Sequence, residues 1–111
     1  TIYHELAKRQ EEPVALIALL AYQYRIMYRV KLLKQKGYTQ YQMREQLKVH
    51  PYVIKMALER EKNFSEATLK SIIDALAETD ARIKMGHMDK HIAFELLLYT
   101  LIETVKSAQF T

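Results

Sequence analysis

Apolar residues recur along most of the chain with the three-to-four-residue spacing of α-helices, and the breaks between the apolar segments are short. Capping or helix-ending residues stand at these breaks, which predicts helices at about 2–11, 14–36, 40–48, 51–62, 66–85 and 90–106. With 2 Gly and 2 Pro, the chain has little material for hairpins or long loops. The pattern therefore predicts an all-α fold, a compact bundle of five to six helices.

Two of the predicted helices are apolar around more than one face, whereas a surface helix normally has a single apolar stripe. We expect the helix at 14–36 to be buried on two sides. It carries Leu16, Ile17, Leu19, Leu20, Tyr24, Met27, Tyr28, Val30 and Leu33. The helix at 90–106 is too apolar for a simple surface helix, with Ile92, Phe94, Leu96, Leu97, Leu98, Tyr99, Leu101, Ile102 and Val105.

The segment 37–57 predicts two short helices joined by a tight turn, a helix-turn-helix-like pair inside the bundle. Gly37 suits the positive φ that closes a preceding helix, and Thr39 and Gln42 have the spacing of a capping box. Pro51 cannot continue the first short helix but suits the first turn of the next. The pair carries an apolar seam of Met43, Leu47, Val49, Val53, Ala57 and Leu58.

The formal net charge of +4 is concentrated in the first half of the chain, because residues 14–37 contain five cations and no acid. Such a basic face suits nucleic acid or an acidic partner surface. Arg25 and Arg29 are four residues apart and have no acid to pair with on their helix. We predict that their face, with Tyr22 and Gln23 near it, meets a protein partner; the alternative is a pair of solvated arginines.

The sequence contains no motif that would indicate catalysis or metal binding. With Cys 0 there is no disulfide and no thiolate metal site. His87 and His91 are four residues apart, but His87 precedes the expected helix cap Asp89, so the two need not share a face. Both glycines stand alone at helix ends, which argues against a phosphate-binding loop. We expect no catalysis, no metal and no cofactor.

Membrane insertion and specific DNA reading are also disfavoured. The most apolar run, 92–102, contains a glutamate and is too short to span a bilayer. In the helix-turn-helix-like pair, the likely outer face of the second helix offers Tyr52, Lys55 and Glu59. A recognition helix usually presents Arg, Asn or Gln to base edges. We therefore expect DNA contact to be weak or absent.

Four short motifs in order carry a resemblance to a known family. They are Ala21-Tyr-Gln-Tyr-Arg25, Val30-Lys-Leu-Leu33, His50-Pro-Tyr-Val-Ile-Lys55 and Asp80-Ala-Arg-Ile-Lys84, the last followed by Gly86, Met88 and Asp89. From about residue 13 to residue 102 the chain resembles the C-terminal domain of the delta subunit of bacterial DNA polymerase III, a clamp-loader protein.

The resemblance implies a cytoplasmic DNA-replication protein whose helical collar domain packs beside the equivalent domains of the other clamp-loader subunits in a pentameric ring. It implies that this domain is non-catalytic, although the parent complex is a DNA-directed DNA polymerase holoenzyme. It also implies that the sliding clamp is contacted only through an N-terminal part. We expect residues 1–111 to form a single helical collar or oligomerisation domain, a fragment of a longer protein.

These observations lead to one main prediction, an assembly domain of the clamp loader. The candidate partner-interface residues are Tyr22, Gln23, Arg25 and Arg29. The first alternative is a helix-turn-helix nucleic-acid-binding module, and the second is a generic helical homo-oligomerisation domain. The motif positions Gln23, Arg25, His50 and Lys84 carry over no catalytic role.

Overall fold

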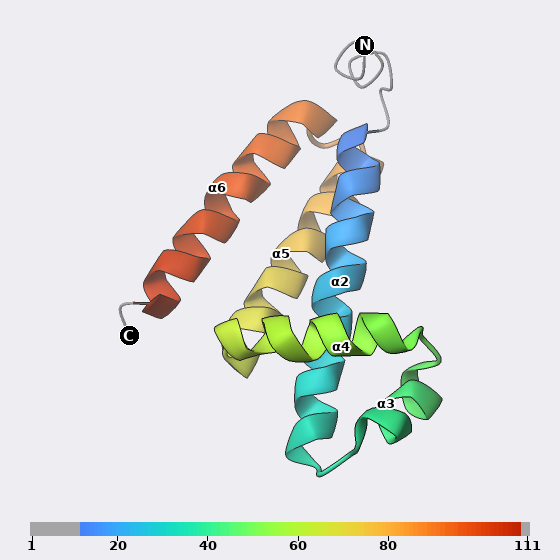
Figure 1. Ribbon diagram of the computed structural model, residues 1–111. Helices are drawn as coiled ribbons and strands as arrows, with labels where there is room; N and C mark the ends of the chain where they lie inside the picture. Colours follow the sequence, from blue (N-terminus) through green and yellow to red (C-terminus); the bar gives the residue numbers. More distant parts are fainter. Residues whose placement is uncertain (1–11, 110–111) are drawn as a thin grey trace, which may run out of the picture.

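The computed structural model of the chain describes residues 12–109, which are almost entirely helical (Figure 1). The helices are α2 (Glu12–Gln35), α3 (Gln40–Leu47), α4 (Pro51–Arg60), α5 (Glu66–Lys84) and α6 (Lys90–Gln109), with a 3₁₀ turn, η1 (Glu61–Asn63), after α4. The predicted all-α bundle is confirmed. The short helix predicted at 2–11 lies outside the described residues.

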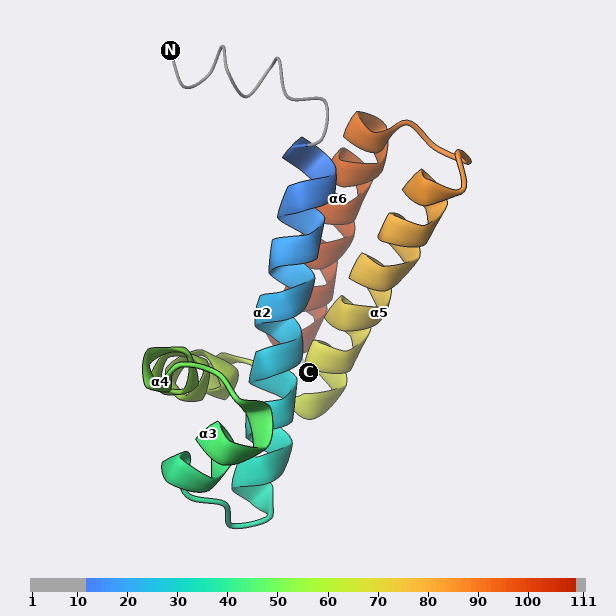
Figure 2. The ribbon, with the colours of Figure 1, turned by 90° about the vertical axis from the view of Figure 1, so that its right-hand side faces the viewer.

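Helix α2 is the centre of the bundle and packs against α4, α5 and α6 (Figures 1 and 2). Helix α5 runs along one side of α2, while α4 crosses the lower half of α2 on the opposite side. Helix α6 packs against α5 and α2, and α3 packs against α4. The two-sided burial predicted for this long helix is therefore confirmed.

The core consists of two adjoining clusters of buried side chains. The first joins the C-terminal half of α2 to α3, α4 and the start of α5 through Ile26, Met27, Val30, Met43, Ile54, Ala57 and Leu69. The second joins the N-terminal half of α2 to α5 and α6 through Ile17, Ala21, Ile72, Leu76 and Leu97. Tyr24 and Phe64 contact both clusters and pack edge to face, with ring centroids 5.7 Å apart. The helix-turn-helix-like pair is thus part of the bundle.

The ends of the helices follow the local signals in the sequence. The capping box is formed: Gln42 N donates to Thr39 Oγ1 at 3.2 Å, and Thr39 N donates to Gln42 Oε1 at 2.8 Å. Gly37 has φ +86°, a conformation that strains other residues. Pro51 begins α4, and His50 caps it, because Nδ1 of His50 accepts a hydrogen bond from Tyr52 N at 3.0 Å.

Two features of the packing differ from what the apolar pattern alone indicates. Ile54, which the predicted seam omitted, is fully buried against α2. Leu16 and Leu19, by contrast, remain 42% and 52% exposed. Leu19 lies on the side of α2 that faces α4, and α4 crosses only the lower half of α2 (Figure 1), so none of the described helices covers Leu19. In the described part of the chain, no helix is long and apolar enough to cross a membrane.

One buried carboxylate connects α2 to η1. Glu61 is 2% exposed, and its oxygens accept from Lys31 Nζ at 2.6 Å and Lys34 Nζ at 3.2 Å. Burial raises the pKa of Glu61, but the hydrogen bonds and charges of the two lysines outweigh this effect, so the pKa lies below its ordinary value. The ionised carboxylate therefore stabilises the fold.

We expect Glu61→Gln to lower the free energy of unfolding at pH 7 by about 1.5–3 kcal/mol, the range for hydrogen bonds to charged groups. Because the folded pKa is lowered, the stabilisation is present above the unfolded pKa of about 4.3 and is lost as the pH falls through the folded pKa. Denaturant unfolding at pH 7 and pH 3 measures both values, with the exposed Glu103→Gln as control. An equal difference between wild type and Glu61→Gln at both pH values would contradict this account.

Candidate partner interface

Helix α6 exposes a long apolar face although its inner side is well packed. Ala93 and Leu97 are buried on the inner side. On the outer side Ile92, Leu96 and Tyr99 are spaced four and three residues apart and so share one stripe. We call the α6 face the set of residues that remain 43–66% exposed, namely Ile92, Leu96, Leu98, Tyr99 and Ile102. An exposed apolar surface of this kind is a candidate interaction site.

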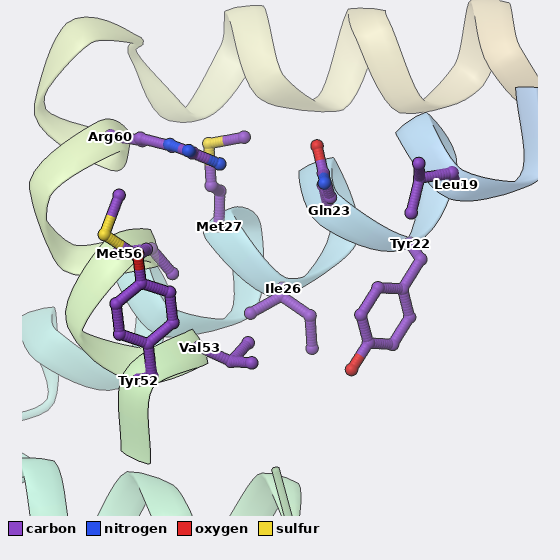
Figure 3. Close-up of a pocket in the computed structure, with 10 residues that line it drawn as sticks. Leu19, Tyr22, Gln23, Ile26, Met27, Tyr52, Val53, Met56 and Arg60 are labelled. Carbon is purple, nitrogen blue, oxygen red and sulfur yellow. The ribbon is translucent and has the colours of Figure 1, made fainter. Parts of the chain in front are cut away.

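A second apolar surface lies where α4 crosses α2 (Figure 3). This α2/α4 groove has a volume of about 270 Å³ and is lined by Leu19, Tyr22, Gln23, Ile26, Met27, Tyr52, Val53, Met56, Ala57 and Arg60. Most of the lining is aliphatic, aromatic or thioether, and Gln23 and Arg60 are its polar members. Tyr22 and Tyr52 are exposed on the two sides of the groove.

The four residues predicted as interface candidates divide between the groove and the surface beside it. Tyr22 and Gln23 line the groove. Arg25 and Arg29 are exposed on α2 outside it, and within residues 12–109 neither forms an ion pair. Tyr22, Arg25 and Arg29 are spaced three and four residues apart, so they share one stripe of α2. This stripe, which we call the arginine stripe, borders the groove at Tyr22.

The half of the groove that α4 supplies was not predicted from the sequence. Tyr52, Met56 and Arg60 line the groove because α4 crosses α2. This crossing depends on contacts between residues far apart in the chain, which helical periodicity does not predict. The sequence places Tyr52 on the predicted outer face of the second short helix but does not indicate what lies opposite it. A usable signal was the clustering of Tyr, Met and Arg on one short helix, since these residue types are enriched at protein interfaces.

The other motif residues have local structural roles. His50 caps α4, as described above, and Lys84 Nζ lies 2.8 Å from Asp80 Oδ2 within α5. Asp89 Oδ2 accepts from His91 N at 3.0 Å and Ile92 N at 3.2 Å, so it caps α6 with His87 preceding the cap. Among residues 12–109, no three His, Cys, Asp or Glu side chains are grouped so that they could hold a metal ion.

Comparison with known families and proteins gives a consistent result. A family described as "DNA polymerase III delta subunit, C-terminal domain" matches residues 1–101. The DNA polymerase III subunit delta of Bacillus subtilis strain 168 is 38% identical over 102 residues, which is 92% of this chain. That alignment covers 29% of the Bacillus protein, so the chain spans less than a third of the length of this relative.

A solved structure agrees with the sequence comparisons. The Bacillus subtilis DNA clamp loader delta protein (YqeN) superposes with a TM-score of 0.79 at 37% sequence identity. The match covers 95% of this chain and 30% of that protein. No feature of the described helices favours the DNA-reading alternative, since the exposed face of α4 offers Tyr52, Lys55 and Glu59 and no Arg, Asn or Gln in its first turn.

Proposed function

The chain belongs to the family formed by the C-terminal domains of DNA polymerase III delta subunits, and from this premise we propose that it is a non-catalytic assembly domain of the clamp loader. In this proposal it holds the delta subunit in the pentameric collar during DNA replication. Its partners are the corresponding helical domains of the other clamp-loader subunits. The sliding clamp is contacted by other parts of the delta protein.

The observation that carries the proposal is the α6 face. The described helices already enclose two clusters of buried side chains, so these exposed residues are not needed to complete the fold. Five large apolar side chains on one helix nevertheless remain 43–66% exposed. Covering such a surface with another subunit removes apolar area from water and so favours association. An assembly role accounts for this exposure, whereas an isolated monomeric domain does not.

The proposal is tested by introducing charge on the α6 face. We expect Ile92→Asp combined with Tyr99→Asp to weaken binding to the other clamp-loader subunits of the same organism at least tenfold, about 1.4 kcal/mol. The physical reason is that a carboxylate buried at an apolar interface loses its hydration. Affinity is measured by calorimetry or surface binding, and circular dichroism verifies that the variant is folded.

A matched control places the same charges elsewhere. Ala77 and Ala81 are exposed on α5, so Ala77→Asp with Ala81→Asp changes the net charge equally without touching the α6 face. This control is expected to bind like wild type. If the α6 variant also assembles with wild-type affinity, the α6 face is not the assembly surface and the proposal loses its main support.

A further inference from the structure

The α2/α4 groove has the chemistry of a binding site for a helix of a protein partner. Resting on the assembly role proposed above, we infer that this groove binds one helix of a neighbouring clamp-loader subunit. The bound helix presents a stripe of apolar residues to the groove and a carboxylate to Arg60. This assignment goes beyond the α6 face, because it concerns a separate surface made by different helices.

The apolar part of the groove fits an amphipathic helix. The buried Met27 of α2 lies beneath the groove, whereas Met56 of α4 is half-buried, and its flexible thioether side chain can adapt to an inserted side chain. Tyr22 and Tyr52 supply large, rigid contact surfaces on the two sides (Figure 3). Helices that bind in such grooves insert apolar side chains spaced three, four and seven residues apart.

The polar residues of the groove favour a partner helix that carries negative charge. Its two polar lining residues, Gln23 and Arg60, both carry hydrogen-bond donors. Neither side chain forms a hydrogen bond or ion pair with another residue in the described part of the chain. No acid lines the groove, and the arginine stripe adds positive charge at its Tyr22 side.

A carboxylate is the group that complements this arrangement. The guanidinium of Arg60 can bind a carboxylate with two parallel hydrogen bonds. A phosphate of DNA would also be attracted to Arg60, but the aliphatic and thioether walls give a strongly hydrated backbone nothing to replace its water. An apolar helix with an Asp or Glu satisfies both the walls and the arginine.

The experiment compares groove variants with matched variants on α3. Arg60→Glu and Tyr52→Ala alter the groove, and Arg44→Glu and Tyr41→Ala are the controls, since Tyr41 and Tyr52 are 64% and 61% exposed. Binding of each variant to the intact neighbouring subunits is measured first. Synthetic peptides that cover each helix of the C-terminal domains of those subunits are then titrated against the same variants.

We expect both groove variants to bind the intact subunits at least tenfold more weakly than wild type, while the α3 controls are unchanged. One amphipathic, acid-containing peptide should bind wild type, lose at least tenfold in affinity for Arg60→Glu, and regain affinity when its acid is replaced by lysine. That recovery identifies the charge pair directly, because loss of folding cannot produce it.

Three outcomes would overturn the inference in distinguishable ways. If the groove variants bind the intact subunits like wild type while the α6 variant is impaired, the groove assignment fails and the proposed function stands. If wild type binds none of the subunits, both fail. If the groove variants lose affinity for duplex DNA but not for the subunits or peptides, the groove is a DNA contact instead.

Discussion

Reversing both arginines of the arginine stripe, Arg25→Glu with Arg29→Glu, is expected to weaken assembly with the other clamp-loader subunits by roughly 2–5 kcal/mol. This loss is expected because acidic side chains of the partner that face the stripe would be buried next to the introduced glutamates, which repel them. Both arginines are exposed and make no ion pair within residues 12–109, so the fold does not depend on them. Helicity and the free energy of unfolding should therefore hardly change.

A control with the same charge change separates a local contact from general electrostatic attraction. Arg44 and Lys48 are also exposed and four residues apart, but they lie on α3 and its C-terminal cap. Arg44→Glu with Lys48→Glu should bind the subunits nearly as wild type does at about 0.15 M salt, where distant charges are screened. Wild-type affinity after the reversal of Arg25 and Arg29 would show that these arginines are solvated and lie outside the interface.

The helix boundaries could be predicted from the sequence because their causes are local. Thr39 and Gln42 form their capping box within three residues, and Gly37 and Pro51 impose backbone conformations on their own positions. These capping and helix-ending features depend only on residues within a single turn, so the local sequence is enough to predict them. The three-to-four-residue spacing of Leu69, Ile72 and Leu76 likewise places them on one face of α5, although their burial comes from packing against other helices.

The crossing of α4 over α2 could not be predicted from the sequence pattern. The long-range contacts that the pattern does not predict mostly result from this crossing. Glu61 is paired with Lys31, 30 residues earlier in the chain, and no local pattern marks that contact. Arg60 and Met56 belong to the groove for the same reason. The sequence therefore predicts only the α2 half of the candidate site. Tyr22 and Gln23 could be predicted from their own helix, whereas the residues that face them are brought there by long-range packing.

The integration of the helix-turn-helix-like pair into the bundle leads to the other large expected effect. Ile54 lies on α4, is 0% exposed and belongs to the cluster that includes Val30 of α2 and Leu69 of α5. Truncating a fully buried isoleucine to alanine removes apolar contacts and leaves a cavity. We therefore expect Ile54→Ala to lower the free energy of unfolding by about 2–5 kcal/mol.

The way in which this stability is lost tests whether the pair is part of the domain. Because Ile54 belongs to the buried cluster that α4 shares with α2 and the start of α5, the amides of α2, α4 and α5 should all exchange faster by native-state hydrogen exchange, and denaturant unfolding should stay a single transition. The neighbouring exposed Lys55→Ala is the control and should change stability by no more than about 0.5 kcal/mol. If Ile54→Ala instead exposed only the amides of α3 and α4, the pair would be an independently unfolding module. A DNA-reading unit attached to the bundle would then again be a possibility, and the α2/α4 groove would not be rigid enough to serve as a preformed site.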